Sequence, residues 1–376
     1  MTTEIHARSE LTALGLMSGT SRDGIDAAII RTDGSSVVNR GPSTTWTYVE
    51  EFRRQLSDAT LNIGDASGVE AELTALHANV IDKLLEKNQL TFSDIDIIGF
   101  HGHTLFHAPE QRETIQIGDG KLLASLTGIP VVNDLRSADV AEGGQGAPLA
   151  PAYHWALAKE LEKPVAVLNI GGVANVTWIG DSPPNLGDFD TQDQIVPQML
   201  AFDTGPGNAL LDDWAARHTG ERYDRDGRLA ATGNVDADAL ARLLENPYFS
   251  ASPPKSLDRD AFSLEPLALL SPADGAATLV AFTTQTVSVA ADFLPSPPTR
   301  WLVTGGGRHN PEMMSALTQK VGAPVAPVES VGWDGNILEA EAFAFLAVRS
   351  VKGWPNSWLN TTGVPRPCVG GVLHRP

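Results

Sequence analysis

Three short turns rich in glycine are the parts of this sequence best suited to hold a phosphate group. The turns are Ser18-Gly19-Thr20-Ser21, Gly171-Gly172 and Gly305-Gly306-Gly307. Glycine lets backbone amides approach a phosphate because no Cβ stands in the way, and serine and threonine hydroxyls supply further donors. Any one of these segments could be only a tight turn. Because all three follow apolar, strand-like runs, together they favour a nucleotide site.

The residues beside these turns extend the candidate nucleotide site. Asp23 and Gly24 follow the first turn, and Asn310 follows the third. Asp23 could orient a magnesium ion through water, or its side chain could merely bond its own turn. Magnesium keeps several waters and needs few protein carboxylates, so the sequence leaves the metal ligands unassigned. The common phosphate loop, G-x-x-x-x-G-K-[ST], is absent, so nucleotide binding would depend on the other glycine turns.

Asp203 is the best candidate for a general base. It ends an apolar run and precedes the Gly-Pro-Gly sequence of residues 205–207, which leads into an expected helix. In α/β folds the strand ends that face a crevice carry the chemistry, and a glycine turn can bring backbone amides close to a ligand. The alternative is an aspartate that caps the turn or the helix.

Strands alternating with helices are expected to position these residues. Apolar runs predict strands at 11–18, 24–32, 95–100, 114–117, 130–133, 164–170 and 300–304. Helices are predicted at 68–88, 120–126, 207–217, 276–291 and 336–349. This alternation is typical of an α/β fold. The hairpins near residues 20 and 171 are alike and lie about half a chain apart, which indicates an internal duplication.

The composition suits a protein of two domains. The chain has 376 residues, of which 42% are hydrophobic. It has 27 Lys and Arg against 46 Asp and Glu, a formal net charge of −19, which disfavours nucleic acid and anionic lipid as partners. The single cysteine, Cys368, excludes an internal disulfide and a zinc site built from cysteines. No run of 18 uncharged apolar residues occurs, and we expect a cytoplasmic protein without a membrane partner.

Nine motifs, in order from about residue 11 to the end of the chain, resemble those of the anhydro-N-acetylmuramic acid kinases. They are GLMSGTSRDGID (15–26), TIQIGDG (114–120), GGQGAPLAP (143–151), LNIGGVANV (168–176), FDTGPGN (202–208), RYDRDG (222–227), PKS (254–256), VTGGGRHNP (303–311) and EAFAFLA (341–347). The resemblance implies a two-lobed α/β fold of the actin-like ATPase (ribonuclease H-like) type, with duplicated domains and the nucleotide in an interlobe cleft. One lobe would comprise residues 1–140 plus 335–376, and the other residues 150–334.

The resemblance also implies an activity. Family members phosphorylate 1,6-anhydro-N-acetylmuramic acid with ATP, and water opens the anhydro bridge in the same event. The product is the 6-phosphate, and the reaction belongs to cell-wall recycling. In this chain Asp203 would be the base that activates the water. ATP would be the co-substrate and Mg²⁺ the metal cofactor, and relatives suggest a homodimer.

Five polar residues are candidates for contacts with the sugar: Thr104, Asp134, Arg136, Asp139 and Glu339. Arg136 could hold an anion such as a lactyl carboxylate, or it could form a surface salt bridge. Thr104 could bond a sugar hydroxyl or simply fill a strand. Glu339 matches a family position near the sugar, but Asn336-x-x-Glu339 also fits a helix capping box.

Two other functions are compatible with these residues. A kinase of another 1,6-anhydrosugar, such as levoglucosan, would share most of the motifs and differ in the pocket for the N-acetyl and lactyl groups. An actin-like or chaperone ATPase would lack sugar turnover, although we identify no peptide-binding domain or polymer-forming insertion. Two residues depart from the family pattern: His103, where relatives usually have Gln, and Arg22, where they often have Leu.

Overall fold

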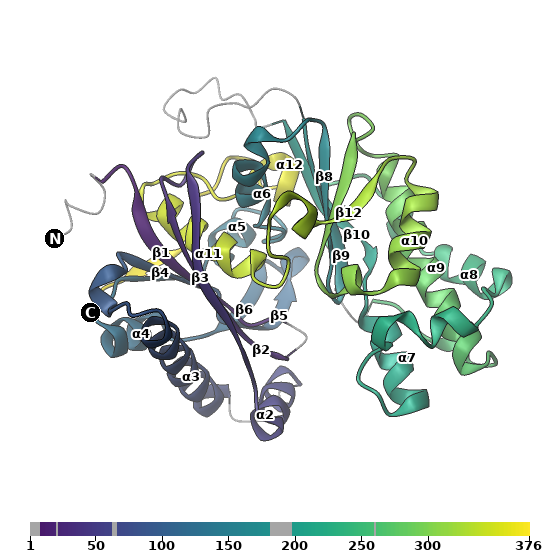
Figure 1. The fold of residues 1–376 in the computed structure, drawn as a ribbon, viewed down its shortest axis with the longest axis horizontal. Coiled ribbons are helices and arrows are strands. Elements are labelled where there is room, and N and C mark those ends of the chain that lie inside the picture. The colour runs from purple at the N-terminus through teal and green to yellow at the C-terminus, as the bar shows by residue number, and fades with distance from the viewer. Residues whose placement is uncertain (1–7, 20–21, 62–65, 181–197, 259–260) are drawn as a thin grey trace. The chain divides into compact units, whose positions relative to one another are not determined.

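The structure is a computed structural model, and it describes residues 8–19, 22–61, 66–180, 198–258 and 261–376. These residues form two compact units, whose ribbon is shown in Figure 1. Unit 1 comprises the described residues of Met1–Glu160 and Asn336–Pro376. Unit 2 comprises the described residues of Leu161–Asp181 and Gln198–Gly335. The C-terminal segment therefore belongs to the same unit as the N-terminal hairpin.

A six-stranded mixed sheet forms the centre of unit 1. Its strands are β1 (Leu11–Met17), β2 (Gly24–Thr32), β3 (Val38–Thr47), β4 (Ile97–Phe100), β7 (Val131–Asn133) and β13 (Val372–His374), in the order β13-β7-β4-β1-β2-β3. The first three strands form an antiparallel meander. β4 then pairs parallel with β1, and β7 pairs parallel with β4. The first predicted hairpin is confirmed, and its turn joins β1 to β2.

Unit 2 repeats this arrangement with a five-stranded sheet. Its strands are β8 (Val165–Ile170), β9 (Val173–Ile179), β10 (Met199–Pro206), β11 (Arg300–Thr304) and β12 (Val325–Pro327), in the order β10-β9-β8-β11-β12. β8, β9 and β10 are antiparallel, whereas β11 pairs parallel with β8 and with β12. When the strands of each sheet are numbered in chain order, both sheets contain the order 3-2-1-4-5. The duplicated α/β fold predicted from the sequence is therefore confirmed.

Helices cover the sheet of unit 1. They include α2 (Glu50–Thr60), α3 (Ala66–Lys87), α4 (Gly120–Thr127), α5 (Ser137–Ala141), α6 (Pro151–Leu157), α11 (Leu338–Val351) and α12 (Leu359–Thr362). The buried helix α11 lies against β1 and β4, where two glycines make room for its backbone. A Cβ at Gly15 would stand 1.8 Å from the carbonyl oxygen of Ala340, and one at Gly99 would stand 2.0 Å from that of Phe343. Close helix–sheet contact here therefore requires glycine.

The opposite face of the same sheet holds the hydrophobic core of unit 1. Leu14 and Leu16 of β1 alternate with the residues that face α11, so they point to the other side. There they join a cluster of buried side chains that includes Leu73 and Val80 of α3. Helices therefore pack on both faces of this sheet, as expected for a sheet with parallel central strands.

Helix α6 marks the end of the first part of unit 1. The hydroxyl of Tyr153 donates a hydrogen bond of 2.8 Å to Oε2 of Glu341 in α11, and its ring centroid lies 5.5 Å from that of Phe345. These contacts hold residues 150–160 in unit 1, whereas the sequence placed the start of the second lobe at residue 150. The first part of unit 1 ends instead at Glu160.

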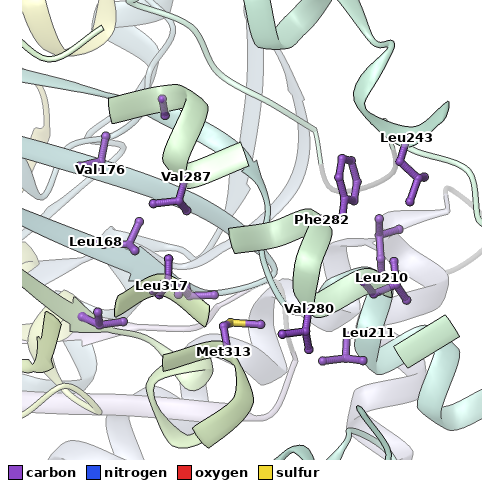
Figure 2. Packing of buried hydrophobic residues seen from close by; sticks show 14 of the residues in the cluster. Leu168, Val176, Leu210, Leu211, Leu243, Val280, Phe282, Val287, Met313 and Leu317 are labelled. Atoms are coloured by element: carbon purple, nitrogen blue, oxygen red, sulfur yellow. The ribbon is translucent and has the colours of Figure 1, made fainter. Parts of the chain in front are cut away.

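The core of unit 2 is built from its sheet and four of its helices. The helices of this unit include α7 (Ala209–Thr219), α8 (Ala237–Leu244), α9 (Pro272–Ala291) and α10 (Pro311–Lys320). Figure 2 shows Leu168 of β8 near Val287 of α9 and Leu317 of α10 in the same buried cluster. Ser271 caps α9, since its hydroxyl accepts a hydrogen bond from the amide of Asp274.

Two further features of the described residues bear on the site. A separate hairpin of β5 (His103–Ala108) and β6 (Glu113–Ile117) follows β4. Among the helices that the structure describes, none has the length and apolar character needed to cross a membrane.

Candidate active site

The first glycine turn, in unit 1, is tied to the protein through the side chain of Ser18. The hydroxyl of Tyr48 donates to Oγ of Ser18 at 2.8 Å, and Oγ lies 3.1 Å from Nδ1 of His103. Burial, and then the charge of Arg22, lowers the pKa of His103 to about 4, so the ring is neutral and can accept the proton of Ser18. The hydroxyl of Ser18 is therefore bonded to two side chains of the protein. We expect backbone amides to supply the main phosphate contacts of this turn.

The rest of the first turn is held by backbone hydrogen bonds. The amide of Arg22, a residue with φ of 55°, donates to the carbonyl of Gly19 at 3.0 Å. Asp23 is exposed, and one of its carboxylate oxygens lies 3.8 Å from the guanidinium of Arg53. Thr20 and Ser21, which the sequence placed in the nucleotide site, lie outside the described residues.

Gly24 has a structural explanation. A Cβ at this position would stand 2.0 Å from the carbonyl oxygen of Trp46 on β3. Glycine therefore lets β2 and β3 approach each other at the start of the hairpin. The predicted nucleotide contact of Gly24 is not needed to account for the residue.

The second and third glycine turns come together in unit 2. They follow β8 and β11, which are parallel neighbours, so both turns lie at the carboxyl edge of the sheet. Asn208 joins the second turn to the start of α7: its amide donates to the carbonyl of Gly171 at 2.7 Å, and its Nδ2 donates to that of Ile170 at 2.9 Å. A Cβ on Gly305 would stand 2.4 Å from Oδ1 of Asn169, so the third turn packs directly against the end of β8. Gly172 accepts a further bond, from the amide of Gly207 at 2.9 Å.

At two glycines of these turns a Cβ would make only ordinary van der Waals contacts with the protein. The nearest atom to a Cβ built on Gly171 would be 3.6 Å away, and the nearest to one on Gly306 would be 3.4 Å away. By contrast, a Cβ on Gly307 would stand 2.4 Å from the side chain of Ile170. Packing within the protein therefore does not require glycine at residues 171 and 306, which is compatible with backbone that approaches a ligand.

Arg308 and Asn310 support the third turn. The guanidinium of Arg308 donates to the carbonyl of Gly305 at 2.7 Å and to Oε1 of Glu329 at 2.9 Å, and the side chain is 3% exposed. Sequence reasoning missed this residue, although it lies inside the motif VTGGGRHNP. Oδ1 of Asn310 accepts hydrogen bonds from the amides of Glu312 and Met313, so this side chain caps α10. The predicted nucleotide residue Asn310 thus has a local structural role.

Asp203 lies near the end of β10 and is 7% exposed. The pairing of β10 with β9 shifts by one residue between Asp203 and Gly205, which is the signature of a β-bulge. Oδ2 of Asp203 accepts a hydrogen bond of 2.8 Å from the amide of Leu257. The helix-cap alternative is wrong, because α7 begins at Ala209 and its N-cap residue is Asn208. Bulges often re-aim a side chain next to an active site, which fits the predicted role of Asp203.

Residues 11–376 match the sequence profile of the anhydro-N-acetylmuramic acid kinase family. This chain belongs to that family. The resemblance found in the motifs is thus confirmed over nearly the whole sequence. Members of the anhydro-N-acetylmuramic acid kinase family are phosphotransferases by name, so the chain is a kinase.

Individual members of the anhydro-N-acetylmuramic acid kinase family are close in sequence. The kinase of Paramagnetospirillum magneticum is 54% identical over 367 residues, which cover 97% of this chain and 99% of that protein. The kinase of Rhodospirillum rubrum is also 54% identical over 367 residues, covering 96% of this chain and 93% of that protein. A solved structure of xylulose kinase from Lactobacillus acidophilus is similar at a TM-score of 0.45 and 9% identity, covering 97% and 94% of the two chains. The strand order of the two sheets, and not this distant match, defines the fold.

Arg136, one of the residues predicted to contact the sugar, follows β7 in unit 1. Its Nε donates to Nε2 of His101, which follows the neighbouring strand β4, and its NH1 donates to the carbonyl of Gly146 at 3.1 Å. The guanidinium of Arg136 thus contacts a buried ring and a backbone carbonyl. His101 was not selected as a site residue from the sequence. Its position directly after a parallel strand could have marked it.

Asp139 is fully enclosed by donors of unit 1. Oδ1 accepts a hydrogen bond of 2.6 Å from the amide of Gly146, and Oδ2 accepts one of 2.6 Å from the hydroxyl of Thr362. The hydroxyl of Ser357 also donates to Oδ2. With a side chain that is 1% exposed, Asp139 joins the glycine-rich loop to the C-terminal segment. It can affect a substrate only by positioning these segments.

The other three predicted sugar residues also lie in unit 1. Thr104 on β5 receives a long hydrogen bond of 3.4 Å from Nε2 of Gln116 on β6. Asp134 has φ of 50° and lines a cavity of about 360 Å³ together with Gln116 and other polar residues. Glu339 is exposed on the first turn of α11. The predicted capping box is wrong, because α11 begins at Leu338 and its N-cap residue is Ile337, with no side-chain cap.

No metal cage is formed by the described residues: among them, no group of three or more His, Cys, Asp and Glu side chains could hold a metal ion. The two histidines that follow β4, His101 and His103, form hydrogen bonds with other side chains of unit 1. Nδ1 of His103 meets Ser18, and Nε2 of His101 meets Arg136.

Proposed function

We propose that this protein uses ATP to convert 1,6-anhydro-N-acetylmuramic acid into N-acetylmuramic acid 6-phosphate, a reaction of cell-wall recycling. The observation that carries the proposal is the match to the family over residues 11–376, with relatives 54% identical over nearly their full length. The matched residues include every glycine turn and the strand that holds Asp203. The names of these relatives support 1,6-anhydro-N-acetylmuramic acid as the substrate.

Asp203 is the proposed general base. A water molecule attacks the anomeric carbon, C1, and gives a proton to the Asp203 carboxylate. The bond between C1 and O6 of the anhydro bridge breaks, and O6 attacks the γ-phosphorus of ATP, so that ADP leaves. The reaction consumes one water and one ATP for each sugar and forms the C1 hydroxyl and the O6–phosphate bond. Two features support Asp203 in this role: it is nearly buried at a bulge, and its Oδ2 is held by the amide of Leu257.

Backbone groups of the glycine turns are proposed to bind the ATP phosphates. Support comes from Gly171 and Gly306, where packing within the protein does not require glycine, and from the position of both turns at the carboxyl edge of the sheet. In unit 1 the turn of residues 18–23 would contribute amides, because the Ser18 hydroxyl is already bonded. Such a set of amides stabilises negative charge without requiring a phosphate loop of the common type.

Magnesium is proposed as the cofactor that accompanies ATP. The described residues form no carboxylate cage, which fits an ion held mainly by phosphate oxygens and water. Asp23, exposed in the first turn, is the carboxylate best placed in sequence to contact its waters. When bound, the ion would neutralise phosphate charge during transfer.

The sugar is proposed to contact unit 1 through Arg136, Glu339 and Thr104. Arg136 supplies a fixed cation for the lactyl carboxylate, since its guanidinium is held by His101 and by the carbonyl of Gly146. Glu339 is exposed and is not engaged in a capping box. Asp134 and Asp139 would act by shaping the loop that carries Arg136.

An assay of ADP release with a panel of 1,6-anhydrosugars tests the proposal. We expect release with 1,6-anhydro-N-acetylmuramic acid and at least ten times less with levoglucosan, because only the first offers a carboxylate to Arg136. Phosphate on O6 of the product can be located by NMR. Equal or faster turnover of levoglucosan would make the protein a kinase of that sugar. ADP release that no sugar stimulates would make it an ATPase.

A further inference from the structure

A second segment of unit 2 holds Asp203 from the side that has no strand neighbour. β10 is the edge strand of its sheet, so outward-facing main-chain groups must find other partners. The amide of Asp203 donates to the carbonyl of Lys255 at 3.0 Å, and the hydroxyl of Tyr248 donates to the carbonyl of Asp203 at 2.6 Å. Both main-chain polar groups of Asp203 are thus fixed by residues that lie about fifty positions later in the chain.

The same segment also holds the carboxylate. The amide of Leu257 donates to Oδ2 at 2.8 Å, only two residues beyond the carbonyl that accepts from the Asp203 amide. One short stretch of chain therefore fixes both the backbone of Asp203 and the rotation of its side chain. A general base must present its oxygen within hydrogen-bond reach of the proton that it removes, so this rotation matters to the reaction.

Lys255 anchors this stretch. Its side chain is 9% exposed, and its Nζ donates to the carbonyl of Tyr248 at 2.8 Å. The same Nζ lies 4.6 Å from the ring centroid of Tyr248 and 4.8 Å from that of Phe293, within the range of cation–π attraction. The side chain of Lys255 therefore binds Tyr248. In addition, the carbonyl of Lys255 and the hydroxyl of Tyr248 each bond the main chain of Asp203.

We propose that Lys255 and Tyr248 are positioning residues that, through residues 254–257, hold the Asp203 carboxylate in its reactive orientation. The inference rests on the proposed role of Asp203 as the base. Neither residue is needed to contact the sugar or the nucleotide. Their effect should therefore fall on the rate of the chemical step and leave the binding of ATP unchanged.

Two single variants test this role. Lys255→Met replaces the lysine with an apolar side chain of similar length, so that the Nζ donor is lost. Tyr248→Phe removes only the hydroxyl that donates to Asp203. We expect kcat to fall about 10- to 100-fold in Lys255→Met and about 3- to 10-fold in Tyr248→Phe, with KM for ATP within about twofold of the wild type. Unchanged kcat in both folded variants would overturn the proposal. Tyr248→Phe decides the matter alone if Lys255→Met does not fold.

Lys352 offers a matched control in unit 1. Its Nζ donates to the carbonyls of Ser9 and Asp33 and lies 5.0 Å from the ring centroid of Trp354, so its surroundings resemble those of Lys255. Lys352→Met should lower the melting temperature and leave kcat of the folded enzyme unchanged. An equal loss of kcat in both lysine variants would mean that kcat reports general loosening, and would overturn the specific role of Lys255.

A double-mutant cycle with Asp203→Asn separates positioning from independent effects. If Lys255 acts only through the Asp203 carboxylate, Lys255→Met should cause no further loss of kcat in the Asp203→Asn background. The same fold loss in both backgrounds would overturn the inference while leaving Asp203 as the base. If Asp203→Asn alone keeps more than about a tenth of the wild-type rate, the proposed base is wrong and the inference fails with it.

Discussion

Nε of Arg136 donates a hydrogen bond to Nε2 of His101 across 3.1 Å. Because an arginine nitrogen can only donate, Nε2 of the histidine is the acceptor, and the ring proton lies on Nδ1, where the carbonyl of Gly102 accepts it at 3.0 Å. Burial, and then the charge of Arg136, holds the pKa of His101 well below 6.5. The ring is therefore a neutral, fixed support for the guanidinium.

Replacing Arg136 should change the choice of sugar more than the handling of ATP. In Arg136→Gln we expect KM for 1,6-anhydro-N-acetylmuramic acid to rise about 10- to 100-fold, because a charge-assisted hydrogen bond contributes about 1.5–3 kcal/mol. KM for ATP should stay constant. Steady-state kinetics should be compared with binding of the neutral analogue 1,6-anhydro-N-acetylglucosamine, measured by calorimetry. Equal weakening for both sugars would show that Arg136 does not read the carboxylate.

Replacing Asp203 tests the proposed base directly. Asparagine keeps the shape and still offers an oxygen to the amide of Leu257, but it cannot take a proton from water. We expect Asp203→Asn to lower kcat by about 10²–10⁴-fold and to leave the melting temperature nearly unchanged. Turnover and thermal unfolding should be measured on the same preparation. A variant that melts normally and turns over at more than about a tenth of the wild-type rate would contradict the assignment.

A side chain at Gly171 should fill the space proposed for phosphate. A Cβ there has no protein atom within 3.5 Å, so Gly171→Val should fold normally, while KM for ATP rises about tenfold or more. Gly307→Val is the matched control, because a Cβ there would stand 2.4 Å from Ile170 and should lower the melting temperature. Calorimetric titration with an ATP analogue and thermal melts distinguish the two effects. Normal ATP affinity in folded Gly171→Val would make that turn purely structural.

Buried neutral histidines should make the protein sensitive to mild acid. Burial lowers the pKa values of His77, His103 and His154 to about 4, against 6.5 when unfolded. Between these values the unfolded chain binds more protons, so stability is full above pH 6.5 and is lost as pH falls toward 4. Each histidine should contribute a loss of about 1.5 kcal/mol between pH 6.5 and pH 5.

Urea unfolding at several pH values measures this loss. Because glutamine does not titrate, His77→Gln should reduce the slope of unfolding free energy against pH by the contribution of one histidine. A wild-type stability that is flat between pH 6.5 and pH 5 would contradict the assignment of these histidines as neutral. A slope unaffected by His77→Gln would contradict it for that residue alone.

Local patterns predicted the elements well and their polar roles less well. The apolar runs gave β2, β11 and the two hairpins correctly, because the residues of a buried strand must be apolar whatever lies around them. The spacing of Asn336 and Glu339 predicted a capping box that does not form, since α11 begins two residues later than Asn336. Asp139 was predicted to contact sugar, and its carboxylate is surrounded by donors from the nearby glycine-rich loop and from the distant C-terminal segment.

The sequence by itself determined the duplicated α/β pattern, the family and the identity of Asp203 as the candidate base. These follow from periodicity and from ordered motifs, which are local properties of the chain. Only the tertiary structure decided which polar atoms remain available for a ligand. The partners of Asp203 at Tyr248 and Lys255 lie about fifty residues away, and Arg136 meets His101 thirty-five residues away. Hydrogen bonds of this kind depend on which segments the packed sheets bring together, and no local spacing encodes them.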